Sequence, residues 1–201
     1  MDPTSSAPPI VAVVVTCDPG PWLESVLASI ARQDYPDLSV LVIDAGSETD
    51  PLPRVAAILP EAYVHRLSRR VGFGRAANEA LKAVEGASHF LLCHDDVVLA
   101  PDATRLLVEE AYRSNAGIVG PKVLEWDTSD RLVSVGVGVD RTGATHALVE
   151  RGELDQGQHD SVREVFMVPS GVTLVRADLF VDLGGFDPLV GQFGEDLDLC
   201  W

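Results

Sequence analysis

The chain is poor in cysteine and in basic side chains, and it has no apolar run of membrane-spanning length. Its three cysteines, Cys17, Cys93 and Cys200, form no CxxC pair. They therefore predict buried reduced thiols of a cytoplasmic protein rather than a disulfide framework. The apolar run 10–15 is too short for a signal peptide or a membrane span. We expect no membrane span in this chain, and leave open a full-length protein that associates with the cytoplasmic face of a membrane.

The charge balance restricts the possible partners. Fifteen Lys and Arg stand against 31 Asp and Glu, which gives a formal net charge of −16. Such a chain repels the phosphates of nucleic acids and the headgroups of anionic lipids, so nucleic acid is not an expected partner. An anionic ligand would need local help from a metal ion, an arginine or a helix N-terminus.

The hydrophobic pattern predicts one α/β domain. Residues 1–9 are polar and rich in Pro and Ser, so we expect a disordered leader followed by a domain over residues 10–201. Strand-like runs alternate with segments of helical spacing, which is typical of βαβ units and of a mostly parallel central sheet flanked by helices. Glycines among short apolar pieces indicate a small β excursion near 132–168. The expected strands are 10–16, 40–43, 63–65, 90–93, 118–124, 166–168 and 172–175, and the expected helices lie near 21–30, 52–59, 75–84, 106–111 and 177–183.

Polar side chains follow three of the predicted strands. They are Thr16-Cys17-Asp18, Asp44, and His94-Asp95-Asp96. A single Asp at a strand end is as well explained by a turn or a helix cap as by function. In an open parallel sheet, however, ligands bind outside the carboxyl ends of the strands. Three such ends on one edge favour a binding site.

The His94-Asp95-Asp96 tripeptide has the composition of a metal site. In an extended chain, His94 and Asp96 point to one side and Asp95 to the other. An imidazole and a carboxylate with open positions for water and phosphate oxygens suit Mn²⁺ or Mg²⁺ that bridges a diphosphate. A solvated loop is the alternative explanation.

The segment 72–77 matches the loose GxGxxA pattern of dinucleotide sites. It does not follow the first strand, and no acidic strand end lies at the expected distance. We therefore interpret its glycines as a close backbone approach to a ligand or a neighbouring strand, with Arg75 either contacting a phosphate or lying on the surface. A dinucleotide-dependent oxidoreductase is therefore the weakest of the functional interpretations, because it depends on this segment alone.

The last residues are acidic. Glu195, Asp196 and Asp198 fall in the first turn of an expected helix, where acids are favoured by the helix dipole. The functional alternative makes one of them a general base. Because the helix has only about one turn before Trp201, we expect the chain to be the N-terminal piece of a longer protein.

Five segments carry motifs in a fixed order. The typical patterns are a nucleotide-contacting strand end, VDxGSxD, GFxxxxN, an acidic metal motif followed by VLxPD, and GGFDxxFxxxxEDxDLxxR. The corresponding segments are Val11–Asp18, Val42–Ser47, Gly72–Asn78, Leu91–Val98 and Gly184–Trp201. Together they resemble a family 2 glycosyltransferase with the GT-A fold, a Rossmann-like α/β architecture, over nearly the whole chain from Ile10 onward.

The resemblance implies a role for each matching residue. Asp44 would hold the base or ribose of a nucleotide sugar. Asp96, with His94, would bind a divalent metal (Mn²⁺ or Mg²⁺) on the diphosphate, and Asp196 would be the general base. The remaining donor-binding residues would be Thr16, Asp18, Arg75, Asp95 and Gly171, the last lying beneath the sugar. His94 stands where the family has the first acid of its metal motif, and the arginine expected after Trp201 is not in this chain.

The expected activity is inverting, metal-assisted sugar transfer from a nucleoside diphosphate sugar. The acceptor would be a hydroxyl of a carbohydrate or lipid-linked precursor of the cell envelope. The alternative is a non-catalytic nucleotide-sugar-binding or docking module of a larger membrane-associated protein.

Overall fold

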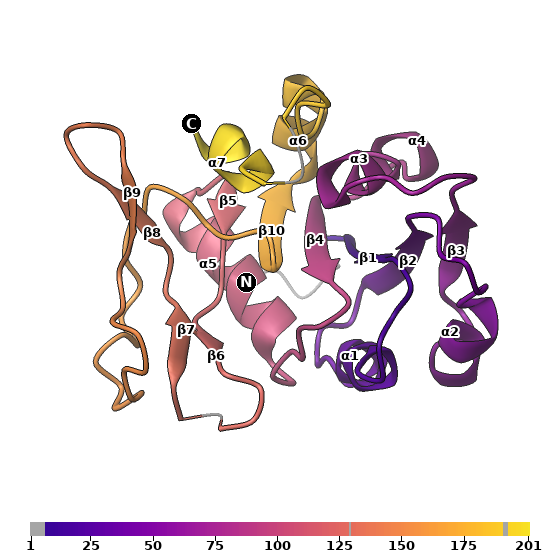
Figure 1. The fold of residues 1–201 in the computed structure, drawn as a ribbon, viewed down its shortest axis with the longest axis horizontal. Coiled ribbons are helices and arrows are strands. Elements are labelled where there is room, and N and C mark those ends of the chain that lie inside the picture. Colours follow the sequence, from indigo (N-terminus) through magenta and orange to yellow (C-terminus); the bar gives the residue numbers. More distant parts are fainter. Residues whose placement is uncertain (1–6, 129, 191–192) are drawn as a thin grey trace.

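A six-stranded sheet forms the centre of the chain in a computed structural model that describes residues 7–128, 130–190 and 193–201 (Figure 1). The strand order is β3-β2-β1-β4-β10-β5. Strands β1 to β4 pair in parallel, and β10 runs antiparallel to both β4 and β5. The strands are β1 (Ile10–Thr16), β2 (Leu38–Asp44), β3 (Tyr63–Arg66), β4 (His89–His94), β5 (Ile118–Val119) and β10 (Val172–Arg176).

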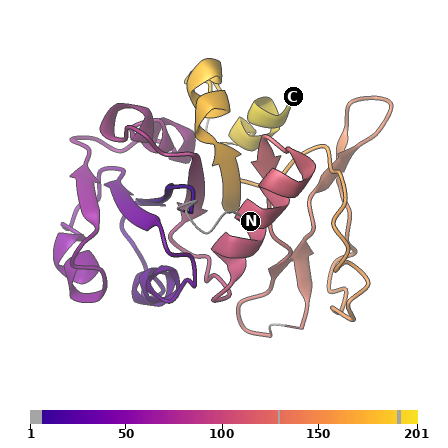
Figure 2. The same ribbon diagram turned by 180° about the vertical axis from the view of Figure 1, so that it is seen from behind.

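Helices cover both faces of the sheet. In Figure 1, α3, α4 and α6 lie above it and α1 and α2 below, while Figure 2 shows α5 from the other side. The helices are α1 (Leu23–Ala31), α2 (Leu52–Ile58), α3 (Phe73–Ala77), α4 (Ala80–Ala83), α5 (Ala103–Ser114), α6 (Ala177–Leu183) and α7 (Glu195–Cys200). The prediction of a mostly parallel, Rossmann-like α/β sheet flanked by helices is confirmed.

Side chains of β1 alternate between the two faces of the sheet, and this alternation divides the core into two layers. Ala12 and Val14 belong to the cluster under α1, α2 and α5. Val13 and Val15 belong to the cluster under α3, α4 and α6. Because successive side chains of a strand point to opposite faces, an all-apolar strand needs helices on both sides. The β-branched run 10–15 therefore specifies the central strand of a covered sheet.

A small β region follows the main part of the sheet, as the glycine-rich texture predicts. Strand β6 (Val123–Leu124) pairs with β7 (Leu132–Ser134), and β8 (Val137–Val139) pairs with β9 (Thr145–Ala147). Lys122, the residue before β6, forms two ion pairs with the polar loop that follows β9. Its Nζ lies 2.6 Å from Asp155 Oδ2 and 2.5 Å from Asp160 Oδ1.

Three of the predicted elements differ in the structure. The strand expected over 118–124 is split into β5 and β6, which belong to different sheets, because Pro121 cannot donate a ladder hydrogen bond. The helix expected over 75–84 is divided into α3 and α4, because amides at Glu79, Leu81 and Lys82 bond three residues back instead of four. The strand expected at 166–168 is reduced to one isolated bridge between Met167 and Val137.

The described part of the domain begins before the predicted boundary at Ile10. The first six residues of the expected leader lie outside the described residues. The Pro8 carbonyl accepts a hydrogen bond from Tyr35 Oη at 2.7 Å, and the Pro9 carbonyl accepts one from the Ser88 amide at 2.8 Å. Residues 7–9 thus pack on the domain, which the polar composition of the segment did not indicate.

None of the helices in the described part of the chain is long and apolar enough to cross a membrane.

A bidentate ion pair joins α1 to α2. Arg54 Nε lies 2.6 Å from Glu24 Oε1 and Nη2 lies 2.8 Å from Oε2. The same guanidinium donates to the carbonyls of Pro19 and Gly20. The hydrogen bonds from Arg54 lower the pKa of Glu24 to about 2. The pair therefore fixes the loop after β1, where the strand-end residues begin.

Glu24→Gln should lower the free energy of unfolding at pH 7 by less than about 1 kcal/mol, because the carboxylate is partly exposed to solvent. A depressed carboxyl pKa stabilises the fold above the unfolded value and loses that effect as pH falls toward the folded value. The difference between variant and parent should therefore vanish between about pH 4.5 and pH 2 in urea unfolding. A difference that grows on acidification would contradict this assignment.

Candidate active site

The carboxyl ends of β1, β2 and β4 meet at one edge of the sheet. The register places Thr16 beside Asp44 and Val15 beside His94. Chain order along the sheet reverses between β1 and β4, which is the switch point where open α/β sheets bind ligands. Thr16, only 1% exposed, donates a hydrogen bond of 2.5 Å from Oγ1 to Asp95 Oδ2 across this point. The predicted convergence of the three strand ends is therefore what the structure shows.

A cavity of about 710 Å³ opens at this edge. Its walls come from residues 15–17 with Ala45, residues 69–75, His94 with Asp95, and residues 187–190 with Glu195. Four of the predicted site residues line it, namely Thr16, Arg75, His94 and Asp95. The volume is in the range of natural small-molecule sites.

Three exposed arginines stand on one wall of this cavity in a chain of net charge −16. Arg70 pairs with Asp18. Arg75 donates to the Pro188 carbonyl, at 2.6 Å from Nη2 and 3.2 Å from Nε. Arg69 makes no side-chain hydrogen bond or ion pair with the part of the chain that the structure describes. The wall is therefore a local positive surface, as an anionic ligand requires.

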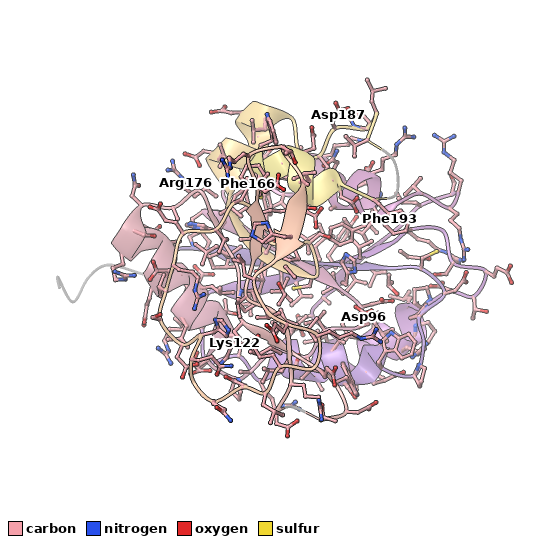
Figure 3. All side chains as sticks on the ribbon, turned by 60° about the vertical axis from the view of Figure 1, so that its left-hand side comes forward. Asp96, Lys122, Phe166, Arg176, Asp187 and Phe193 are labelled. Carbon is pink, nitrogen blue, oxygen red and sulfur yellow. The ribbon has the colours of Figure 1, made fainter. Side chains whose placement is uncertain are left out.

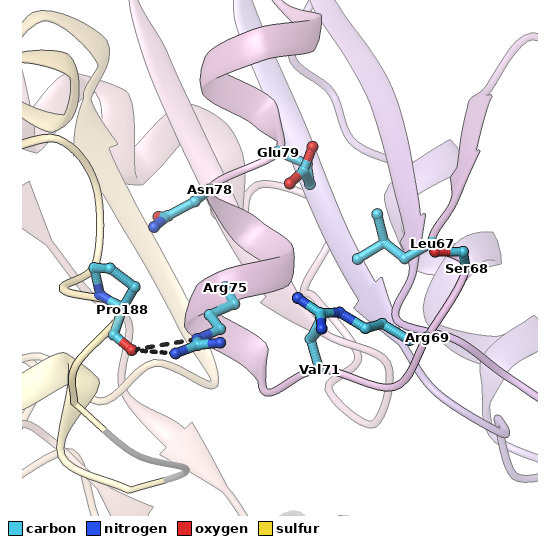
Figure 4. A pocket seen from close by; sticks show the side chains of 8 residues that line it. All are labelled: Leu67, Ser68, Arg69, Val71, Arg75, Asn78, Glu79 and Pro188. Carbon is cyan, nitrogen blue, oxygen red and sulfur yellow. Dashed lines mark hydrogen bonds between the residues drawn. The ribbon is translucent and has the colours of Figure 1, made fainter.

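A second cavity, of about 370 Å³, adjoins the first (Figure 4). The two share Arg69, Val71, Arg75 and Pro188. Figure 4 shows Arg75 reaching across to Pro188, with Arg69 on the other side of the space. Both arginines therefore face both cavities.

Asp18 and Asp44 hold the loops around the cavity instead of lining it. Asp44 is fully buried, and its Oδ1 accepts the Ser47 amide at 2.8 Å. Arg66 Nε lies 2.9 Å from Oδ2 but off the direction of a hydrogen bond, so this oxygen has a charge partner and no donor. For Asp44 to hold a base or ribose, Arg66 would have to release it. Asp18, at φ +49°, accepts the Glu48 amide and pairs with Arg70.

The chain turns immediately after β4, so residues 94–96 do not alternate as in a strand. Extended structure ends at His94, and Asp95 and Asp96 lie in a turn. His94 and Asp95 line the cavity. Asp96, which is labelled in Figure 3, is exposed. The expectation that His94 and Asp96 share one side is therefore not met. Burial raises the pKa of Asp95, against the opposing hydrogen bond from Thr16, and the charge of Asp96 adds to the rise.

The residues near this turn fit a shared cation and not a protein-only metal centre. Across the described ranges, no three His, Cys, Asp or Glu are grouped to hold a metal ion. Asp96 offers an exposed carboxylate that makes no side-chain hydrogen bond or ion pair with described residues. Mg²⁺ in phosphate-binding enzymes is commonly held by one or two carboxylates together with substrate phosphates. The donor set matches that arrangement.

Helix α7 brings two carboxyl groups to the edge of the site. Glu195 is 7% exposed and lines the cavity, and its Oε2 has no hydrogen-bond partner. Asp196 accepts the Ser170 amide at 3.2 Å on Oδ2 and the Leu197 amide at 2.9 Å on Oδ1. It is not among the cavity-lining residues. The neighbouring Gly171 carbonyl accepts the His94 amide at 3.0 Å, so α7 is connected to the end of β4.

The described protein atoms around Gly171 leave room for a side chain at this position. A Cβ there would meet only Val97, at 3.8 Å, and its φ is not positive. The described structure around it does not demand a glycine. Its proposed place beneath a sugar stays a prediction.

Asn78, the last residue of the GFxxxxN pattern, holds the segment before α7. Its Nδ2 donates to the Phe186 carbonyl at 2.8 Å, and its Oδ1 accepts the Phe186 amide at 2.9 Å. Gly74 completes the contact, since a Cβ there would lie 3.0 Å from Phe186 Cβ. The close approach of Gly74 is therefore to the segment before α7 and not to a strand, whereas Gly72 has no described atom near a Cβ position and its approach to a ligand stays a prediction.

The α/β sheet, with its cavity at the β1–β4 switch point, has the GT-A fold of the solved glycosyltransferases that it resembles. The chain matches the family model of the glycosyltransferase like family 2 over residues 8–201, and it is a member of that family. The predicted assignment to a transferase family is therefore confirmed.

The similar proteins act on or bind nucleotide sugars and lipid-linked glycans, as their names state. An N-acetylglucosaminyl-diphospho-decaprenol L-rhamnosyltransferase of Mycobacterium tuberculosis is 28% identical over 95% of this chain and 68% of its own length. The mannosyltransferase PcManGT of Pyrobaculum calidifontis, in complex with GDP-Man and Mn²⁺, has a TM-score of 0.66 and 22% identity over 97% of this chain and 51% of its own. S. aureus TarS 1–349 with UDP-GlcNAc has a TM-score of 0.66 and 19% identity over 96% and 52%. The chain thus spans about half the length of these two solved structures.

Gly46 positions the arginine wall. It has φ +91°, and a Cβ would overlap the backbone of Arg69 and Arg70. Gly86 has a similar φ of +78° with open space around it, so it serves as a matched control.

Gly46→Ala should destabilise the chain by at least about 1 kcal/mol more than Gly86→Ala in urea unfolding. Both variants bear the strain of a positive φ, but only the first also overpacks a backbone contact. Equal losses of unfolding free energy in the two variants would show that the contact of Gly46 with the backbone of Arg69 and Arg70 does not stabilise the fold.

Proposed function

We propose that this chain binds a nucleoside diphosphate sugar in the 710 Å³ cavity and belongs to an inverting glycosyltransferase. The observation that carries the proposal is the arginine wall. In a chain of net charge −16, three arginines gather where the parallel strands end and where GT-A sheets have their switch point. A diphosphate is the anionic group that this family uses as a leaving group.

The diphosphate would lie between the arginine wall and the turn after β4. Arg69 and Arg75 supply guanidinium donors suited to phosphate oxygens. Thr16 orients Asp95 on the cavity wall by the hydrogen bond at the switch point. Asp18 and Asp44 support the pocket by fixing the loops after β1 and β2, and Asp44 contacts the nucleoside once Arg66 has moved aside.

A divalent cation, Mn²⁺ or Mg²⁺, would be shared between Asp96 and the diphosphate. When bound, it neutralises the charge that develops on the leaving group. Asp96 is suited to this because its carboxylate is exposed at the turn that bounds the cavity. His94, the other expected ligand, lines the cavity, and its ring nitrogen Nε2 is buried without a hydrogen-bond partner in the described structure.

Asp196 would remove the proton from the acceptor hydroxyl. The amides of Ser170 and Leu197 orient its two oxygens, and it lies one residue from the cavity wall at Glu195. With the base on this side and the leaving group on the arginine side, attack and departure would occur on opposite faces of the sugar, as inversion requires. Gly171 leaves space beneath that sugar.

The acceptor would be a hydroxyl of a lipid-linked or other carbohydrate precursor of the cell envelope. The support is the 28% identical relative, which transfers L-rhamnose to a decaprenol-linked sugar by its name. Such an acceptor places the full-length protein at the cytoplasmic face of a membrane.

Asp196→Asn in the full-length protein should lower kcat for sugar transfer by about a hundred- to ten-thousand-fold, because the amide cannot take a proton. The Kd for the nucleotide sugar should change little. Single-turnover transfer and calorimetric binding with UDP-GlcNAc, GDP-mannose and an L-rhamnose nucleoside diphosphate would measure both quantities.

Asp198→Asn is the matched control, since that carboxylate lies on the same turn but is exposed. It should leave kcat unchanged. Near-native transfer by Asp196→Asn would remove Asp196 as the base. Binding of donors with no transfer by the unmodified protein would instead favour the docking-module alternative.

A further inference from the structure

We propose that Asn78 is a positioning residue for the proposed base: by clamping the backbone of Phe186, it sets where α7 begins and therefore where Asp196 lies. This assignment rests on the proposed function, because that function gives Asp196 the proton transfer. Asn78 is not among the residues that line the 710 Å³ cavity. It therefore acts through the segment that it holds and not by touching the donor.

The clamp uses both ends of one side-chain amide. Asn78 Nδ2 donates to the Phe186 carbonyl at 2.8 Å, and the Phe186 amide donates to Asn78 Oδ1 at 2.9 Å. The side chain of Asn has both a donor and an acceptor, so it can satisfy both polar groups of one backbone residue. Two hydrogen bonds to one residue fix the orientation of its backbone as well as its position.

The turn before Phe186 is shaped around the same amide. Gly185 has a φ of +78°, and a Cβ at this position would overlap Asn78 Oδ1. A side chain there would therefore displace the Asn78 amide. Gly184 has the same φ of +78°, but a Cβ there would meet no described atom. The two consecutive glycines thus separate backbone strain from contact with Asn78.

Phe186 connects the clamp to the start of α7. Its side chain is 2% exposed and packs edge-on against Phe73 and Phe180, with ring centroids 5.9 and 5.4 Å apart. A Cβ at Gly74 would lie 3.0 Å from Phe186 Cβ and 3.5 Å from Glu195 Cβ. Phe186 and the first residue of α7 therefore pack on the same point of α3. A shift of Phe186 removes the support of the helix at that point.

The carboxylate of Asp196 has one hydrogen bond from outside its own helix. Its Oδ2 accepts the Ser170 amide at 3.2 Å, whereas its Oδ1 accepts the amide of the next residue, Leu197. A distance of 3.2 Å is at the long end of the range for an N–H···O hydrogen bond. The place of this carboxylate therefore depends on where α7 begins. A displacement of about 1 Å, even from a mutation far from the chemistry, can lower a rate about a hundredfold.

The test breaks the clamp from each of its two sides in the full-length protein. Asn78→Ala deletes the amide, and Gly185→Ala displaces it without changing Asn78. Each variant should lower kcat for sugar transfer to a lipid-linked sugar at least about tenfold. The calorimetric Kd of the donor that the unmodified protein uses, among UDP-GlcNAc, GDP-mannose and the L-rhamnose nucleoside diphosphate, should stay within about twofold, because the cavity walls are unchanged. Gly184→Ala is the matched control and should keep the parental kcat.

Two further measurements distinguish positioning from a general loss of stability. The double variant Asn78→Ala/Gly185→Ala should have about the kcat of Asn78→Ala alone, since the added Cβ no longer meets an amide; independent effects would multiply. In the 201-residue chain, the Asp198 amide, which donates to the Gly194 carbonyl in the first turn of α7, should exchange with solvent at least about threefold faster in each single variant than in Gly184→Ala.

Parental kcat in Asn78→Ala and Gly185→Ala, with only the Tm lowered, would make the clamp purely structural and overturn the proposal. Equal losses of kcat and of donor affinity would overturn it as well, because they would place the effect in the donor cavity. Losses of kcat that multiply in the double variant, or unchanged exchange at Asp198, would also contradict it. An unmodified full-length protein that binds no donor and transfers no sugar would instead overturn the proposed function, and the role of Asn78 in it.

Discussion

The parallel pairing of β1 with β2 on one side and β4 on the other is the constraint on which the site depends. It places Thr16, Asp44 and His94 at one edge in fixed register. The hydrogen bond from Thr16 to Asp95 then joins the two strands where the chain order reverses. Because both faces of these strands are buried, the register cannot slip without moving apolar side chains into the wrong layer. The position of the cavity follows from the strands themselves.

The parts that the sequence predicted well are those set by local patterns. The β-branched run 10–16, the helical spacing of Leu23, Val26 and Ile30, and the strand 90–93 all carry their periodicity in adjacent residues. Pro121 is the local signal for the split of 118–124 between two sheets, because a proline cannot donate a ladder hydrogen bond. Within the site, the strand ends could be placed because parallel strands share an edge.

The remaining parts depend on contacts between distant segments. The turn after His94 sends Asp95 toward Thr16, 79 positions away, and leaves Asp96 exposed. Asn78 holds Phe186 across 108 positions. The burial of Glu195 beside Gly74 likewise has no signal in an acidic helix start. A single sequence shows which residues are polar, but it does not show which polar atoms remain unpaired after folding.

Two residues that line the cavity each bury a polar atom without a hydrogen-bond partner. Oε2 of Glu195 and Nε2 of His94 are buried without partners on the same cavity. Local violations of otherwise satisfied structure concentrate at functional sites. Arg69 and Arg75 line both cavities and make no ion pair with the described part of the chain.

The central claim is that the strand-end cavity binds a nucleoside diphosphate sugar. Backbone hydrogen exchange of the chain with and without donor, in the presence of Mn²⁺, tests it most directly. Bound donor should slow exchange in residues 69–75, 93–96 and 193–197, and leave the hairpin of β8 and β9 unchanged. Unchanged exchange along those three segments with every donor tried, or protection confined to the hairpin, would contradict the account.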